Sequence, residues 1–357
     1  MSTMRFGVIG TGMMGCEHLR NLLPISDAVV TAVSDPNEEP LNWARATLGE
    51  NWSSVTAFTH HQDLLNADLV DALIIASPNH THKKILDDVL NTSIPVMVEK
   101  PMCTTVDDCK VIVEKAKSRT EVTWVGLEYR YMPSIKQFLE SLHSGDIGNL
   151  KMLSIREHRF PFLTKVDNWN RFSRNTGGTL VEKCCHFFDL MNLATQSKPI
   201  RVYASGGQDV NHLDEFYNGE RSDILDNAFV IVDYENGVRA SLDLSMFAEG
   251  GRNEQEIVAV GDTGKLEAAV PGDGNLYLGL RDKKELTVLP ISETEVGHVG
   301  FHHGASYVEL VHFMEAVRGN GPVEVDALAG MWSVVLGAAA HRSIDEGRPV
   351  NIEEYGL

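Results

Sequence analysis

A chain of 357 residues is longer than one ordinary domain and suits two. Hydrophobic residues make up 43% of it and charged residues 23%, a composition typical of a globular protein with a sizeable core. The formal net charge is −19 and lysine and arginine form no cluster, which argues against nucleic acid or an anionic membrane as a partner.

The five cysteines are odd in number, and two of them, Cys184 and Cys185, are adjacent. No CxxC pair occurs, so the pattern favours reduced thiols in a cytosol over a disulfide framework. The start, MSTMRFGVIG, runs into a predicted strand without the features of a signal peptide. The longest apolar run, near residues 331–340, is about half of the ~20 residues that a membrane span requires. We therefore expect a cytoplasmic protein.

Short apolar runs alternate with helix-like stretches from residue 4 to about residue 125. The predicted strands are residues 5–9, 29–34, 72–76, 95–98 and 122–125. The predicted helices are residues 15–23, 40–48, 80–90 and 106–116. This alternation is typical of parallel strands joined by right-handed crossovers, and it predicts a doubly wound, parallel Rossmann sheet over residues 1–125.

The pattern changes after residue 126, where a helix over residues 133–141 comes first. The alternating runs 228–234 and 238–244 flank Asn236-Gly237, which is the strongest short hairpin signal. A second hairpin and two closing helices are predicted at residues 256–260 with 265–270, 306–318 and 327–346. Residues 126–357 are therefore predicted to form a second α/β domain with a large, mostly antiparallel sheet.

Gly10, Gly12 and Gly15 form a GxGxxG motif between the first predicted strand and the first predicted helix. Glycines at these positions permit a tight turn and close approach of the backbone to a pyrophosphate, and the helix N-terminus supplies unpaired N–H groups. Met13 and Met14 complete the loop and are counted with it as cofactor-binding residues. An ordinary glycine turn is the alternative.

Asp35 ends the second predicted strand, about 20 residues after Gly15, which is the separation expected for an acid that binds the adenosine ribose. A carboxylate there accepts hydrogen bonds from the ribose hydroxyls and repels a 2′-phosphate. No arginine adjoins Asp35, and the nearest downstream is Arg45. The sequence therefore predicts NAD in preference to NADP.

Glu99, Lys100 and Pro101 follow the buried run PVMV. This order places Lys100 at the carboxyl end of a parallel strand, where ligands bind in open α/β sheets. A lysine near the dinucleotide can donate to the substrate oxygen and stabilise the alkoxide that develops during hydride transfer. A solvated surface lysine is the alternative.

The stretch GGTLVEKCCHFFDLMNL, residues 177–193, begins with a glycine break before a predicted helix. At 3.6 residues per turn, Glu182, His186 and Asp189 share one face, and Lys183 lies at its edge. His186 can then act as a general base that a carboxylate orients. A solvent-facing polar stripe, a buried histidine satisfied by Glu182 and a metal site are the alternatives. The spacing implies no outside ligand, so no metal is predicted.

The motifs GVIGTGMMG, ASPNHTH, VEKP, GLEYRYMP and GGTLVEKCCHFFDL, together with Asp35, resemble the Gfo/Idh/MocA family of oxidoreductases. This family includes glucose–fructose oxidoreductase and inositol dehydrogenases. The motifs occur in the family's order between residue 5 and about residue 193. The resemblance implies hydride transfer between NAD(P) and a sugar, inositol or related polyol, and a second domain that binds substrate and forms dimers or tetramers.

The resemblance also implies roles for single residues. Lys100 and His186 match the family's catalytic lysine and histidine, and Glu182 stands where many members have aspartate. The residues expected on this basis to lie at the cofactor are Ser77, Pro78, Asn79, His80, Glu99, Lys100 and Arg130. Because Lys183 follows the longer acid, the identity of the acid that binds substrate stays open.

Other candidates for substrate contact come from the polar and aromatic stretch 157–175, whose equivalent lines the pocket in relatives. Trp169 can stack on a sugar ring, and Asp167 and Arg171 can bind hydroxyls. Lys183, Asp189 and the histidines of a glycine-bearing loop are further candidates; those histidines are His298, His302 and His303. A plain surface role is the alternative for each.

These features predict an NAD-dependent dehydrogenase that acts on a CH–OH group of a small-molecule sugar or polyol held between Lys100 and His186. His186 removes the proton, Lys100 stabilises the oxygen, and Glu182 or Asp189 orients His186. One alternative is a glycosidase or epimerase that oxidises its substrate transiently and retains its NAD. The last alternative is a non-catalytic protein that senses NAD.

Overall fold

The computed structural model describes residues 2–292 and 295–357. The chain divides into two compact units, and each consists of three segments. The first unit comprises Met1–Glu128, Lys165–Trp169 and Glu295–Val334, and the second comprises Tyr129–Thr164, Asn170–Thr294 and Val335–Leu357. The predicted division into residues 1–125 and 126–357 treats each part as continuous. Its assignment of cofactor binding to one part and substrate binding to the other stays a prediction.

The first unit is built on a parallel six-stranded sheet in the order β3-β2-β1-β4-β5-β6. Its strands are β1 (Met4–Ile9), β2 (Ala28–Ser34), β3 (Thr56–Phe58), β4 (Ala72–Ile75), β5 (Val96–Glu99) and β6 (Thr123–Gly126). Strands β4, β5 and β6 are buried at every residue, as parallel strands covered on both faces are. The strand order reverses between β1 and β4, so the carboxyl ends of these strands frame the crevice where open α/β sheets bind ligands.

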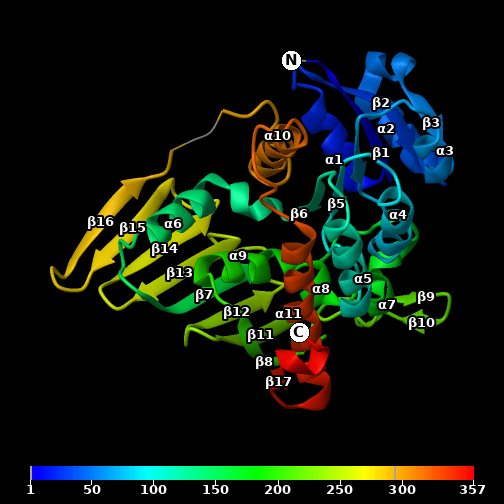
Figure 1. Cartoon of the computed structure of the whole chain (residues 1–357). Helices are drawn as coiled ribbons and strands as arrows, with labels where there is room; N and C mark the ends of the chain where they lie inside the picture. Colours follow the sequence, from blue (N-terminus) through cyan, green and yellow to red (C-terminus); the bar gives the residue numbers. More distant parts are fainter. Residues whose placement is uncertain (1, 293–294) are drawn as a thin grey trace. The chain divides into compact units, whose positions relative to one another are not determined.

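Helices cover this sheet, and all of them except α3, which was not predicted, follow the predicted ranges closely. They are α1 (Met13–Leu22), α2 (Glu38–Leu48), α3 (His61–Leu65), α4 (His82–Val89), α5 (Val106–Lys117) and α10 (Ala305–Val317). Figure 1 shows α10 beside α1, although almost the whole chain separates them in sequence. The indole nitrogen of Trp124 on β6 donates to Glu309 on α10 at 3.0 Å. This bond helps to fix the C-terminal segment in the first unit.

The second unit is built on a nine-stranded sheet in the order β16-β15-β14-β13-β7-β12-β11-β8-β17. The strands are β7 (Leu150–His158), β8 (Pro199–Gly207), β11 (Asn227–Tyr234), β12 (Arg239–Ser245), β13 (Gln255–Gly261), β14 (Gly264–Val270), β15 (Asn275–Leu280), β16 (Glu285–Pro290) and β17 (Val350–Asn351). Strands β7 and β12 are parallel and the other pairs are antiparallel. Both predicted hairpins, β11–β12 and β13–β14, are confirmed. A further hairpin, β9 (Phe216–Tyr217) with β10 (Glu220–Arg221), lies outside this sheet.

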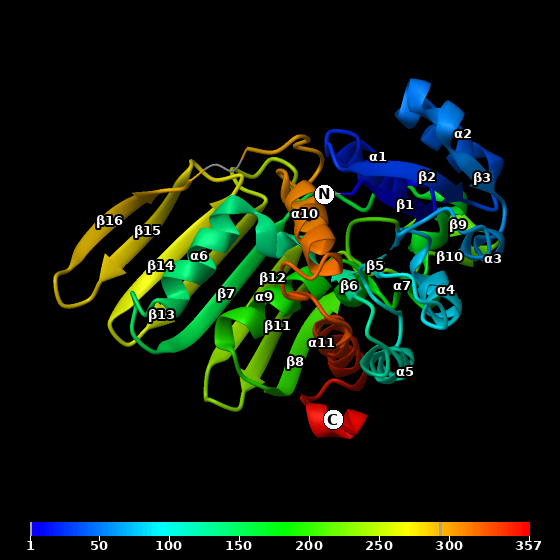
Figure 2. The ribbon, with the colours of Figure 1, turned by 45° about the horizontal axis from the view of Figure 1, so that its top comes forward.

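One face of the nine-stranded sheet carries the helices of this unit, as Figure 2 shows for α6 and α9. The bounds of these two helices are Pro133–His143 for α6 and Cys185–Thr195 for α9, and the shorter α7 (Ser173–Thr176) and α8 (Thr179–Glu182) precede α9. Alternate residues of each strand point to the opposite face, so Val230 on β11 is buried while Phe229 and Ile231 are exposed. Helix α11 (Ala327–Glu346) begins in the first unit and ends in the second. Among the described residues, no helix has the length and hydropathy needed to cross a membrane.

Candidate active site

The glycine-rich loop joins β1 to α1, and each of its three glycines has a different structural reason. Gly10 has φ 88°, and a Cβ there would lie 2.5 Å from the backbone nitrogen of Ser77. A Cβ on Gly15 would lie 2.0 Å from the carbonyl oxygen of Gly10, so Gly15 lets the helix approach the loop. Gly12 faces open space. The predicted Met13 and Met14 form the first turn of α1, so the loop and helix N-terminus fit the pyrophosphate of a dinucleotide.

Asp35 lies directly after β2, and the glycine loop fixes its carboxylate. Oδ2 accepts from the backbone nitrogen of Thr11 at 2.9 Å, and Oδ1 accepts from the backbone nitrogen of Asn37 at 3.0 Å. Oδ2 also accepts from the hydroxyl of Thr11 at 3.3 Å. A carboxylate oxygen can accept more than one hydrogen bond, so Oδ1 retains acceptor capacity for a ribose hydroxyl. The carboxylate is thus oriented in advance beside the loop.

The loop after β4 carries the predicted residues Ser77, Pro78, Asn79 and His80. The backbone of Ser77 packs against Gly10, and Pro78 precedes a short 3-10 helix, Asn79–Thr81. Asn79 is buried, and its Nδ2 has no hydrogen-bond partner within the described part of the protein. A buried amide donor left without an acceptor is destabilising, so this atom fits a site that a polar ligand completes.

His82 links this loop to the one after β5, and the sequence analysis missed it. Its Nδ1 lies 2.9 Å from the carbonyl oxygen of Pro101 and its Nε2 lies 2.9 Å from that of Ser77. Burial lowers the pKa of His82, although both carbonyls oppose this shift. A neutral imidazole has one N–H, so it donates to one of the two carbonyls at a time.

Lys100 follows β5 directly, as predicted, and Glu99 holds its backbone. Glu99 Oε1 accepts from Nε2 of His18 at 2.6 Å, and Oε2 accepts from the backbone nitrogen of Lys100 at 3.2 Å. Burial alone would lower the pKa of His18, but the hydrogen bond and charge of Glu99, with the charges of Glu128 and Glu17, raise it. Glu99, predicted to lie at the cofactor, therefore acts here on the position of Lys100.

Two of the three loop histidines lie on buried carboxylates of the first unit. His302 Nδ1 lies 2.8 Å from Glu128 Oε1, and the hydroxyl of Ser306 also donates to Glu128. Burial raises the pKa of Glu128, but the charge and hydrogen bond of His302, together with the hydrogen bond of Ser306 and the charge of His18, outweigh it and lower the pKa to about 2. His298 lies 3.4 Å from Glu17. These contacts favour a role for both histidines in anchoring their own loop over the predicted contact with substrate.

In the second unit, the stretch 177–193 does not form the single helix that was predicted. Helix α8 ends at Glu182 and α9 begins at Cys185, with a turn between them. The glycine break before α8 is confirmed: Gly178 has φ 88°, and a Cβ there would lie 2.3 Å from Nε2 of His341. Glu182, His186 and Asp189 are all buried, so the alternative of a solvent-facing polar stripe is wrong.

The short 3-10 helix Glu128–Tyr131 meets α9 at two successive residues. The Tyr129 ring is stacked on the imidazole of His186, with 3.8 Å between centroids and 4° between planes. Arg130 donates from Nε and Nη2 to the two oxygens of Asp189, at 2.6 and 2.5 Å. The second unit thus brings Arg130, Glu182, His186 and Asp189 to one buried region, while Tyr129 was missed because a tyrosine carries no such signal in sequence.

Lys183 is also buried, and its ammonium is bound within the protein. Nζ donates to the hydroxyl of Tyr129 at 2.7 Å and lies 2.7 Å from Oε1 of Glu157 on β7. Burial lowers the pKa of Lys183, the charge of Arg159 adds to this shift, and Glu157 opposes it. These contacts favour an internal role for Lys183 over the predicted contact with substrate. Among the described residues, no group of three or more His, Cys, Asp or Glu side chains is arranged to hold a metal ion.

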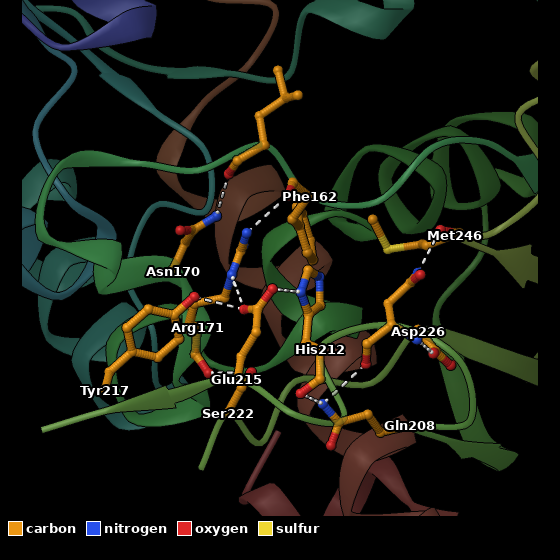
Figure 3. A network of polar contacts seen from close by, with 12 residues as sticks. Phe162, Asn170, Arg171, Gln208, His212, Glu215, Tyr217, Ser222, Asp226 and Met246 are labelled. Carbon is orange, nitrogen blue, oxygen red and sulfur yellow. Dashed lines mark hydrogen bonds and ion pairs between the residues drawn. The ribbon is translucent and has the colours of Figure 1, made fainter. Parts of the chain in front are cut away.

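The weaker candidates in residues 157–175 separate into two environments. In the first unit, Asp167 has φ 53° and precedes a turn that places the Trp169 ring at the edge of His80, 6.2 Å between centroids. In the second unit, Arg171 is buried and donates to Glu215 at 2.9 Å and to the carbonyl of Phe162 at 3.2 Å. Figure 3 shows this network. It holds Nε and Nη2 of Arg171 inside the protein, while Nη1 is buried without a hydrogen-bond partner among the described residues, so the contact with a substrate hydroxyl stays a prediction.

The network around Arg171 ties together two long connections of the second unit. Glu215 also binds His212 Nδ1 at 2.8 Å and accepts from the hydroxyl of Tyr217 at 2.6 Å. Asp226 accepts from the backbone nitrogens of Val210 and Asn211, at 2.7 and 2.6 Å. These bonds give the connection between β8 and β11 a fixed shape.

Both parts of the chain match models of one protein family. Residues 4–127 match the oxidoreductase-family NAD-binding Rossmann fold, and residues 140–352 match the C-terminal alpha/beta domain of the same Gfo/Idh/MocA family. The chain belongs to the Gfo/Idh/MocA family of oxidoreductases. The predicted fold class, the oxidoreductase activity and the NAD cofactor are therefore confirmed.

Relatives in this family extend over the whole chain. The protein is 28% identical over 360 residues to myo-inositol 2-dehydrogenase of Thermotoga maritima, covering 98% of this chain and 99% of that relative. It is 24% identical to scyllo-inositol 2-dehydrogenase (NAD(+)) of Bacillus subtilis, covering 98% and 96%. The solved structure of levoglucosan dehydrogenase with NADH and levoglucosan has a TM-score of 0.85 at 16% identity, covering 98% and 100%. At that identity the likeness concerns the fold alone.

Proposed function

We propose that this protein is an NAD-dependent dehydrogenase that moves a hydride between the nicotinamide and a hydroxyl or carbonyl carbon of a sugar, inositol or related polyol. The observation that carries the proposal is the carboxyl edge of the six-stranded sheet, where the glycine loop, Asp35 and Lys100 are held by hydrogen bonds within one unit. The substrate class is supported by the relatives, which are named as inositol dehydrogenases.

The residues present fit the cofactor. Gly12 leaves open space for the pyrophosphate, Asp35 presents a fixed carboxylate for the ribose, and Asn79 offers a buried donor. A carboxylate at the ribose favours NAD over NADP because it would repel a 2′-phosphate. When bound, the nicotinamide supplies the acceptor for the hydride.

The protein's own side chains then handle the proton and the oxygen. Lys100, whose backbone is held by Glu99, donates to the substrate oxygen and stabilises negative charge as it develops. His186 accepts the hydroxyl proton as a general base. Asp189 acts by fixing Arg130, because both of its oxygens already accept from that guanidinium. Glu182 is the acid that we assign to orient His186 or a substrate hydroxyl.

We further propose that the protein works in the cytoplasm as a homo-oligomer. All five cysteines are buried thiols, which suits a reducing compartment. The face of the nine-stranded sheet opposite the helices exposes large apolar side chains: Met152, Tyr203, Phe229 and Ile231. Tyr203 and Ile231 lie directly opposite each other on adjacent strands, so they form one apolar patch with Phe229, two residues along β11. A second copy of the chain suits such a face.

The test is NADH formation at 340 nm over a panel of sugars, sugar acids, glycosides and inositols, with NAD and NADP compared. We expect turnover of one polyol class with a preference for NAD. Lys100→Met should lower kcat by at least about 1,000-fold and leave NAD binding within about twofold, because it removes an interaction with the substrate oxygen alone. Undiminished turnover in that variant would contradict the role of Lys100. If no compound of the panel yields NADH and NAD stays tightly bound, the protein would instead be an enzyme that oxidises its substrate transiently. If glycosides are not turned over either, the remaining alternative is a non-catalytic protein that senses NAD.

A further inference from the structure

We propose that Tyr129, held by Lys183 and Glu157, is a positioning residue for His186: its ring fixes the plane of the imidazole that takes the substrate proton. The inference rests on the proposed role of His186 as general base. It explains two features of the site: a tyrosine ring is stacked on the proposed base, and a lysine is buried beside that tyrosine.

The stacking restricts the one motion that would disorient the base. An imidazole ring turns about the bond that joins it to Cβ, and this rotation redirects both ring nitrogens. The Tyr129 ring lies parallel to the His186 ring at a centroid separation of 3.8 Å, so any rotation would drive the rings into each other. A general base must present its nitrogen within hydrogen-bond reach of the proton, and a fixed plane favours that orientation.

Tyr129 can act as such a support because it is itself fixed at both ends. Its backbone belongs to the short helix that Arg130 fastens to α9 through Asp189, one turn after His186. Its hydroxyl accepts from Nζ of Lys183 at 2.7 Å. The tyrosine is therefore connected to α9 through Arg130 and to the turn before α9 through Lys183.

Lys183 in turn is fixed by the sheet. Glu157 ends the inner face of β7, a strand near the middle of the nine-stranded sheet, and its Oε1 lies 2.7 Å from Nζ. Nζ also lies 5.0 Å from the centroid of Tyr129 and 5.6 Å from that of Phe187, within reach of both ring faces. A buried ion pair is poor evidence for stability, since apolar residues can replace it without loss, so its position behind Tyr129 favours a part in orientation.

The experiment tests separately the Tyr129 ring, the Tyr129 hydroxyl and the support that Lys183 and Glu157 provide. Tyr129→Leu removes the stacked ring, and we expect kcat to fall by about 10- to 100-fold while the affinity for NAD changes by less than about twofold. Tyr129→Phe keeps the ring and should recover kcat to within about threefold. Lys183→Met combined with Glu157→Gln removes the support without leaving a buried charge alone, and should lower kcat less than Tyr129→Leu does.

A matched control removes an aromatic side chain from α9, the helix that carries His186. Phe188 is fully buried on α9. Phe188→Leu should lower the melting temperature while kcat stays within about twofold. If Tyr129→Leu does not fold, Tyr129→Met has about the same volume but a flexible, unbranched chain that adapts to irregular gaps, and it serves the same comparison. A loss of kcat in Phe188→Leu equal to that in the Tyr129 variant would overturn the proposal, because general loosening of α9 would then explain both.

A double-mutant cycle decides whether Tyr129 acts through His186. In a His186→Asn background, removal of the Tyr129 ring should lower the residual turnover by less than about twofold, because no base remains to be oriented. An equal loss in both backgrounds, or an unchanged kcat in Tyr129→Leu alone, would overturn the inference and leave the general base intact. Full turnover in His186→Asn alone would instead refute the proposed base, so the two failures are distinguishable.

Discussion

His341 lies half-buried on α11, and its Nε2 accepts from the backbone nitrogen of Leu180 at 3.0 Å. That bond requires a ring nitrogen without a proton. Burial lowers the pKa of His341 to about 4, against the opposing effects of Asp345 and Asp223. The histidine therefore stays neutral in the folded protein at pH values where it is protonated in the unfolded chain.

The pH dependence of stability follows from this difference. Between pH 6.5 and about 4 the unfolded chain binds a proton at His341 that the folded chain does not, so the free energy of unfolding falls as the pH falls, by up to about 3 kcal/mol. His341→Gln keeps an acceptor for Leu180 and does not titrate. In urea unfolding between pH 4.5 and 7, the slope of stability against pH should be lower in this variant. Parallel slopes would show that His341 is not the group that titrates.

The residue scale also shows what the sequence could predict of the site. Lys100 and His186 were identifiable because each has a reactive side chain at a recognisable place, after a strand and after a glycine break. His18 and Tyr129 were not, because their importance lies in partners distant in sequence. His18 meets Glu99 across 81 residues, and Tyr129 meets Lys183 across 54. Such pairings come from packing, and no local spacing encodes them.

At the scale of elements, the glycine loop offers a matched pair of substitutions. Gly12→Ala adds a methyl group to open space, so the fold should tolerate it, but the methyl occupies the expected place of the pyrophosphate. We expect a melting temperature within about 2 °C of the original and an NAD affinity reduced at least tenfold. Gly10→Ala, with φ 88° and backbone atoms 2.5 Å from the new carbon, should lower the melting temperature even without NAD. Thermal scans with and without NAD measure both effects. Undiminished NAD binding by Gly12→Ala would place the pyrophosphate elsewhere.

Elements differed in how well periodicity predicted them. The central strands and the two hairpins were predictable because burial on both faces, or on alternate residues, leaves a clear pattern. Strand β3 (Thr56–Phe58) was missed because three residues show no period. The single helix predicted after the Gly177-Gly178 break was wrong, because a turn at Lys183 separates α8 from α9. A helical spacing does not account for that turn. His186 and Asp189 on α9 are nevertheless brought to one region, because Tyr129 and Arg130 pack on them.

For the whole molecule, the uncovered face of the nine-stranded sheet predicts how copies of the chain associate. Phe229 on β11 is 66% exposed on this face. Phe229→Lys places a charge in an apolar contact, so sedimentation should show a smaller species than the original protein at the same concentration. Val323, exposed in the first unit, provides the control, since Val323→Lys should leave the species unchanged. An original protein that sediments as a monomer would contradict the proposed homo-oligomer.

The first unit includes the segment Glu295–Val334, and this bears on biosynthesis. Trp124 finds its partner in Glu309, and the backbone nitrogen of Val125 donates to the carbonyl of Val325 at 3.0 Å. A ribosome must therefore synthesise most of the polypeptide before β6 of the nucleotide-binding unit can form these contacts. Until then the nucleotide-binding unit of the nascent chain lacks part of its packing and is accessible to chaperones and proteases. An excised N-terminal fragment would inherit the same incompleteness permanently.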